Sequence, residues 1–186
     1  IVYGIIGYSM FSTLTSAAYA PPLNENVTQS PIIEIGQPSP EEFANEQLSS
    51  LKEALANTNQ LLSERFPETL TLAKDLALKT KKLLADEKEE AYKISLEEEL
   101  REYAIKIILI NDMIRISGRK KIEFERLIDK LELDKKMSSL NVSQYPALQE
   151  KVGQYLKEST VSIEERVFLL RASKIFTDAE IAKAIE

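Results

Sequence analysis

The sequence predicts an all-α protein, an irregular helical bundle with two or three longer helices and shorter C-terminal helices, preceded by an extended tether. Three Ser/Thr-x-x-Glu capping boxes, which mark the first turns of helices, begin at Ser39, Ser162 and Thr177. Apolar residues recur at heptad spacing over residues 96–114, which is the pattern of a helix packed along a seam. We therefore expect one helical domain over residues 40–186.

The first part of the chain has the composition of an export signal. Residues 1–20 carry no charge and run from an apolar stretch into small polar and then alanine-rich sequence, the order of a secretory signal peptide. A small-x-small site at residues 16–18 predicts cleavage before Tyr19, which makes residues 1–18 the signal peptide. The alternative is a retained membrane anchor, because about 20 uncharged residues can just span a bilayer. We expect a periplasmic, envelope-associated or secreted protein, with any membrane contact through residues 1–20.

Residues 19–39 form a proline-rich tether. Five of the chain's seven prolines fall between residues 21 and 40, and such a stretch favours extended conformations over hydrogen-bonded structure. Within it lies a short apolar run, Ile32, Ile33 and Ile35, which is a candidate strand for pairing with a partner. The plainer alternative is a linker with incidental apolar residues.

Two helices are expected before residue 87. The first covers residues 40–66, because Ser39 can cap it and Pro40 suits the first helical position, and Pro67 then interrupts the hydrogen-bond ladder. The second covers residues 67–86. Its expected inward residues are Leu70, Ala73, Leu76, Leu83 and Leu84.

The next helix, over residues 88–117, carries the heptad seam. The seam consists of Leu96, Leu100, Tyr103, Ile107, Ile110 and Ile114. Residues off the seam are also apolar between residues 103 and 116, so we expect this to be the central helix, covered on several sides. A buried strand is the alternative for the β-branched run near residue 107, but the helical period continues through it.

Gly118 is expected to end that helix, since glycine commonly follows a helix C-terminus. Another amphipathic helix then covers residues 120–140. Its expected inward residues are Phe124, Leu127, Ile128, Leu131 and Met137. A short helix over residues 146–157 and two more after the capping boxes at Ser162 and Thr177 complete the domain.

Composition argues against most chemistry. The chain has no His and no Cys, the usual general base and the commonest transition-metal ligands, so we expect no enzyme, no cofactor and no metal site. Its net charge of −6 argues against nucleic-acid binding. Ser117 and Lys120 match the Ser-x-x-Lys arrangement of a lysine-activated serine, but the companion Ser-Asp-Asn and Lys-Thr-Gly motifs are missing from the sequence.

One basic concentration stands out in this acidic chain. It is a candidate patch for an anion or an acidic partner and comprises Arg115, Arg119, Lys120, Lys121 and Arg126. The alternative is structural: cations near a helix C-terminus favour its dipole, and these can pair with Glu123 and Glu125.

Together these features suggest an exported, non-enzymatic structural or adaptor protein that binds protein partners, in an envelope or secreted assembly, through its helical faces. The alternative is a periplasmic chaperone or assembly factor that holds client polypeptides. A chaperone should leave a large apolar groove open, whereas an adaptor should present a patch matched to a fixed partner.

Overall fold

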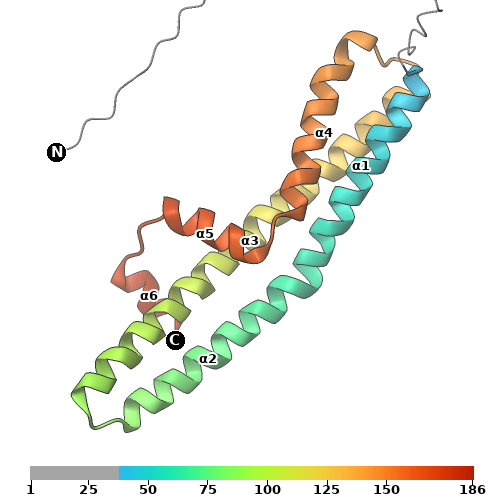
Figure 1. Cartoon of the computed structure of the whole chain (residues 1–186). Helices are drawn as coiled ribbons and strands as arrows, with labels where there is room; N and C mark the ends of the chain where they lie inside the picture. The colour runs from blue at the N-terminus through green and yellow to red at the C-terminus, as the bar shows by residue number, and fades with distance from the viewer. Residues whose placement is uncertain (1–37) are drawn as a thin grey trace, which may run out of the picture. The chain divides into compact units, whose positions relative to one another are not determined.

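The computed structural model describes residues 38–186, of which 88% are helical and none forms a strand. Figure 1 shows long helices followed by shorter C-terminal ones, which confirms the predicted all-α bundle. The helices are α1 (Pro40–Gln60), a π-helical segment (Leu61–Arg65), α2 (Phe66–Asp86), α3 (Glu90–Lys136), a 3₁₀ turn (Val142–Gln144), α4 (Tyr145–Thr160), α5 (Ile163–Ser173) and α6 (Asp178–Ala184).

Pro67 does not end the first helix. The chain passes from α1 through the π segment into α2 without a loop, and the Phe66 N–H bonds to the Leu61 carbonyl five residues back. Proline lacks an N–H and crowds the carbonyl of the preceding turn, and the wider π turn before it takes up that distortion. The predicted boundary between residues 66 and 67 is therefore a change of helical register.

Gly118 does not end a helix either. The predicted helices 88–117 and 120–140 are one helix, the 47-residue α3, about 70 Å long at 1.5 Å per residue. A glycine inside a helix lowers stability by only about 0.5–1 kcal/mol. The burial of Phe124 and Leu131, which are at most 2% exposed, can offset more than that. The helix ends at Lys136. Two residues later, Ser138 takes the left-handed conformation, with φ of 49°, that glycine commonly adopts after a helix C-terminus.

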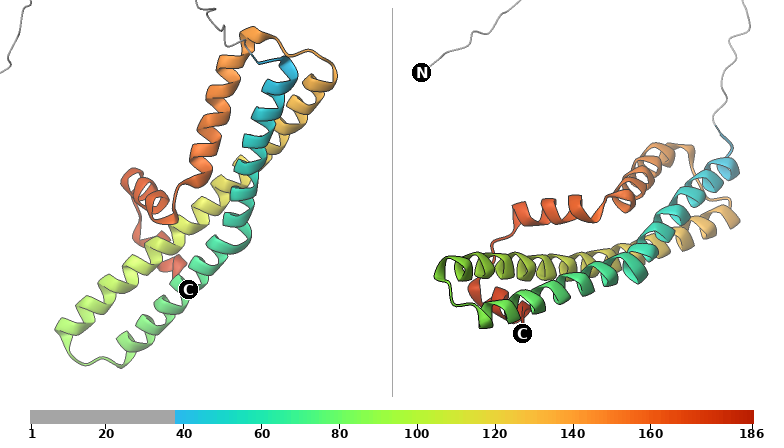
Figure 2. Two further views of the ribbon diagram at one scale, coloured as in Figure 1. Left: turned by 45° about the vertical axis from the view of Figure 1, so that its right-hand side comes forward. Right: turned by 60° about the horizontal axis from the view of Figure 1, so that its bottom comes forward.

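Two groups of apolar clusters hold the bundle together. One lies between α1, the C-terminal part of α3, and α4, around Leu51, Phe124 and Val152. The other lies where the N-terminal part of α3 meets α2, α5 and α6, around Phe66 and Ile110. Because α3 takes part in both, it is the central helix, as predicted (Figure 2).

The seam residues point inward as expected, with Leu96, Ile107 and Ile110 at most 3% exposed. Two inward predictions are wrong: Leu83 is 55% and Met137 70% exposed. Leu83 lies outside the buried stripe because the π turn adds a residue to the repeat before α2. Met137 is the residue that follows the last turn of α3.

The predicted helix starts are present at all three capping sequences. Ser39 and Glu42 form a reciprocal capping box, as do Thr177 and Glu180. At the third, the Ser162 hydroxyl accepts a hydrogen bond from the Glu165 N–H, as an ordinary N-cap does.

No helix within residues 38–186 is long and apolar enough to cross a membrane.

Candidate functional site

The five residues of the predicted basic patch all lie on α3 but do not form one patch. Arg115, Arg119 and Arg126 are spaced by four and seven residues, so they share one exposed helix face. Lys120 and Lys121 point to other faces, where they pair with Glu123 and Glu125 respectively. The structure therefore divides the predicted site into an arginine face and two lysines in local ion pairs.

Lys120 ties α3 to α4. Its ammonium lies 3.3 Å from the Glu123 carboxylate, 3.5 Å from that of Glu158, and 5.0 Å from the ring centroid of Tyr155. Burial acts to lower the pKa of Lys120, but the hydrogen bond to Glu123 and the charges of Glu158 and Glu123 outweigh it, so its pKa is raised. This lysine is held in its charged form and stabilises the helix contact.

A small cavity beside Lys120 contains the Ser-x-x-Lys pair. It measures about 330 Å³ and is bordered by Ser117, Lys120, Arg166 and Leu169, among others. A lysine that activates a serine must be able to lose its proton near neutral pH, which requires a lowered pKa. The raised pKa of Lys120 gives no support to nucleophilic catalysis at Ser117.

Arg166 borders the same cavity and has a structural role. Its guanidinium donates to the backbone carbonyls of Val161 and Glu158, at the C-terminal end of α4. Burial lowers its pKa, against the opposing charges of Glu158 and Glu165. A cation at this end of a helix satisfies carbonyls that lack an intrahelical partner.

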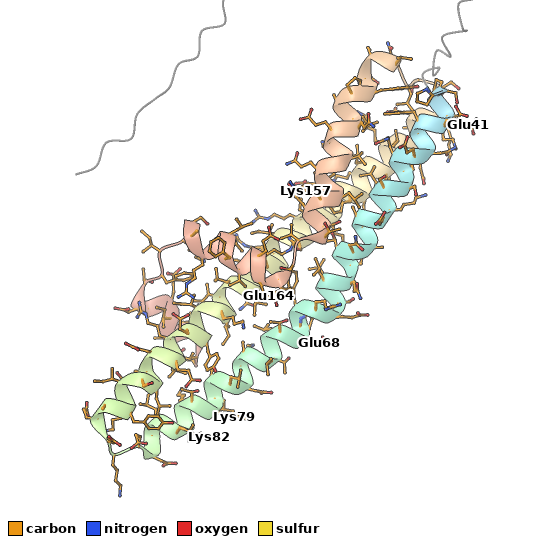
Figure 3. The ribbon with its side chains drawn as sticks, viewed as in Figure 1. Glu41, Glu68, Lys79, Lys82, Lys157 and Glu164 are labelled. Atoms are coloured by element: carbon orange, nitrogen blue, oxygen red, sulfur yellow. The ribbon has the colours of Figure 1, made fainter. Side chains whose placement is uncertain are left out.

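The arginine face is sparsely paired. Arg115 lies 3.3 Å from Asp112, whose other oxygen is 2.6 Å from Lys174. Arg119 and Arg126 are exposed, and neither has an ion-pair partner within residues 38–186. Elsewhere the helix surfaces carry charges of both signs, as the labelled side chains of Figure 3 illustrate.

Sequence reasoning did not anticipate the exposed apolar side chains at α5. Phe168 is 71% and Leu169 57% exposed, and Ile175, in the linker to α6, is 92% exposed. The sequence does contain a pattern that predicts this exposure, because apolar residues lie on all sides of α5. One face, with Val167 and Leu170, is enough to pack on the bundle. The remaining apolar side chains must point to solvent.

A larger cavity lies at the opposite end of the bundle, between the start of α1 and the end of α3. It measures about 910 Å³. Leu48 and Leu140 contribute apolar surface, but charged residues such as Lys52, Glu132 and Lys135 border it too. Lys52 and Glu132 are paired across it at 3.0 Å. This lining suits neither a metal nor a wholly apolar ligand.

Residues 38–186 contain no group of three or more side chains placed to hold a metal ion. The candidate partner strand, Ile32, Ile33 and Ile35, and the predicted signal peptide lie outside the described residues. No protein-family model, no curated protein and no solved structure matches the chain.

Proposed function

We propose that this chain is a non-enzymatic structural or adaptor protein that binds other proteins through its exposed helical faces. The observation that carries the proposal is the exposure of Phe168, Leu169 and Ile175, three large apolar side chains within eight residues of α5 and its linker. Scattered apolar residues are normal on a protein surface, but large ones gathered in a short segment are typical of interaction sites.

The non-enzymatic part of the proposal rests on chemistry. The sequence contains no His or Cys, and Lys120, the lysine of the Ser-x-x-Lys pair, has a raised pKa. General acid–base catalysis near neutral pH favours groups whose pKa values are shifted toward 7. We also propose that the chain is exported, which the signal-peptide composition of residues 1–18 supports.

The adaptor reading is favoured over the chaperone alternative by the nature of the exposed surface. A holding chaperone needs a broad apolar groove for unrelated clients. The 910 Å³ cavity instead has a lining of mixed charge, and the exposed apolar residues of α5 and its linker form a short segment, which suits a fixed partner.

Affinity isolation of the mature chain from its native source tests the adaptor role. A specific partner should be retained by the wild-type chain and by the control L78D, because Leu78 is a 53% exposed leucine on α2. The double variant F168D/I175D should lose it. Equal retention by all three would refute the role of α5, and suppression of unrelated clients' aggregation without a stable partner would favour the chaperone.

N-terminal sequencing of the same material tests cleavage before Tyr19.

A further inference from the structure

One face of α3 has a symmetric pattern of charges and apolar residues. At spacings of three and four residues it comprises Glu90, Ile94, Glu97, Arg101, Ala104, Ile108, Asp112, Arg115, Arg119, Ile122 and Arg126. The two glutamates lie toward the N-terminus and three of the four arginines toward the C-terminus, with Arg101 and Asp112 as the exceptions, and Ile94 and Ile122 lie one in each half. Ile94 is 53% and Ile122 49% exposed, so neither end belongs to the core.

Three of the five position pairs related by Ile108 are complementary, and the other two pair Arg101 with Arg115 and Ala104 with Asp112. Glu90 and Arg126 each lie 18 residues from it, Ile94 and Ile122 each 14, and Glu97 and Arg119 each 11. Two copies of α3 placed antiparallel, with a two-fold axis at Ile108, would therefore bring each glutamate opposite an arginine and each isoleucine opposite an isoleucine. Two-fold symmetry requires such a self-complementary surface.

The charges that would pair have few competing partners within the chain. Glu97, Arg119 and Arg126 form no ion pair within residues 38–186, and Glu90 has a single pair, at 3.8 Å, with Lys93. Arg101 would meet Arg115 of the second copy, but that arginine is accompanied by Asp112 at 3.3 Å, whose carboxylate would lie between the two. A parallel in-register pairing would instead put each residue opposite its own copy, so Glu97 would face Glu97 and Arg119 would face Arg119. Charge therefore favours the antiparallel arrangement.

In the monomer, α6 covers the middle of this face. Asp178 pairs with Arg101 at 3.0 Å, Ile181 packs with Ala104, Ile105 and Leu109, and Lys174 in the preceding linker pairs with Asp112 at 2.6 Å. Two α3 helices at ordinary packing distance, 8–10 Å between axes, leave no room for this cover. Ile181 is the sole buried residue of the seven-residue α6.

We propose that the face of α3 from Glu90 to Arg126 is a self-association surface for a second copy of this chain, and that α6 is a removable cover that keeps it closed. Displacing α6 uncovers Ala104 on this face and Ile105 beside it, and permits an antiparallel α3–α3 dimer. The dimer buries these apolar residues again and joins the free charges of the two copies. This inference does not depend on the proposed adaptor role, since it concerns the purified chain alone.

The test begins with the full chain carrying I181D, which places a charge at the buried contact of α6. Sedimentation equilibrium should show the mass of one chain for wild type and of two chains for I181D. The matched control is I175D, in the same C-terminal segment but at a 92% exposed position, which should remain a monomer. Circular dichroism must show equal helicity, apart from α6, for the chains compared.

Charge reversal then tests the pairing itself in the I181D chain. R119E/R126E should return it to a monomer, as should E90R/E97R, and the four substitutions together should restore the dimer, because opposite charges again face each other. K79E/K82E, at the α2 positions labelled in Figure 3, should leave the dimer intact.

Two results would overturn the proposal. One is an I181D chain that stays folded and monomeric at all accessible concentrations. The other is an I181D dimer that the charge reversals on α3 leave unchanged, which would show association through some other exposed apolar surface. If I181D fails to fold, A184D, which alters a partly buried contact of α6, replaces it, and the same outcomes apply.

Discussion

At the residue scale, two tyrosines of α4 show how differently a buried hydroxyl can be accommodated. Tyr145 and Tyr155 are each 7% exposed. The Tyr155 hydroxyl donates to Glu123 at 3.4 Å, whereas the Tyr145 hydroxyl has no hydrogen-bond partner within residues 38–186, and its ring stacks on Phe43 with centroids 3.8 Å apart. A buried hydroxyl without a hydrogen bond costs about 1–3 kcal/mol.

The two tyrosines therefore predict opposite responses to the same substitution. Tyr145→Phe removes an unsatisfied group and keeps the stacked ring, so it should leave the free energy of unfolding unchanged or raise it by up to about 1 kcal/mol. Tyr155→Phe should lower it by about 0.5–1.5 kcal/mol. Urea denaturation of both variants checks this, and a larger loss for Tyr145→Phe would mean that its hydroxyl is hydrogen-bonded in solution.

The pair between Glu102 and Arg171 gives a prediction about pH. Arg171 donates to both Glu102 oxygens, at 2.7 and 2.8 Å, and this hydrogen bonding lowers the pKa of Glu102 below 4.5, against partial burial. The folded-state pKa is thus below the unfolded one, so the stabilisation is complete above about pH 4.5 and is lost as the pH falls through the lowered pKa.

Both side chains are about half exposed, so the stabilisation is small, on the order of 0.2–1 kcal/mol after solvent screening. Glu102→Gln should be less stable than wild type by that amount at pH 7. The difference should disappear below the pKa of the folded state. Paired urea titrations at pH 7 and pH 2.5 measure it, and a difference that persisted at pH 2.5 would assign the effect to packing.

At the element scale, the sequence predicted helix identity better than helix length. The starts at Ser39 and Thr177 follow from local capping chemistry, and the seam over residues 96–114 follows from periodicity. The helix ends predicted at Pro67 and Gly118 are wrong. Tertiary packing on both sides outweighs the small local cost of Gly118, and the π turn before Pro67 takes up the larger distortion that proline causes. The same limit applied to the basic patch, since only the continuity of α3 shows which of its cations share a face.

If Gly118 ended a helix, replacing it with alanine would lower the free energy of unfolding. Inside α3 the opposite change is expected. Gly118 has an ordinary helical backbone, and beyond the adjacent backbone of α3 itself a Cβ there would meet no atom of residues 38–186 within 4 Å. Gly118→Ala should therefore raise the free energy of unfolding by about 0.5–1 kcal/mol. Gly153→Ala in α4, which is equally free of contacts, is the matched control. A destabilised Gly118→Ala would indicate that α3 breaks at this position in solution.

At the scale of the whole molecule, stability should be uneven. The central part of α3 is buried by neighbours on several sides, with Ala104, Leu109 and Ile110 at most 1% exposed. By contrast, α6 is a seven-residue helix held by Ile181 and by polar contacts on exposed side chains. Local opening should therefore occur first at α6.

Hydrogen exchange measures this difference. Amides of α6 should exchange much faster than those of residues 104–113, and α5 should be intermediate, because Arg171 and Val167 attach it to the bundle. Exchange of α6 at the rate of central α3 would show that the C-terminal helix opens only with the whole domain, and would leave no closed-to-open equilibrium for a cover.

The π segment, Leu61–Arg65, also determines which residues of α2 face α3. Without its additional residue, the three-and-four repeat of α1 would continue through Leu72, Leu76 and Leu83; with it, Ala73 and Ala77 face α3. A chain lacking Ser63 would have to place leucines where alanines now allow close approach, so this deletion should destabilise the domain by several times more than Ser63→Ala, as thermal denaturation would show. Insertions and deletions in this segment should therefore matter far more than the identity of its residues.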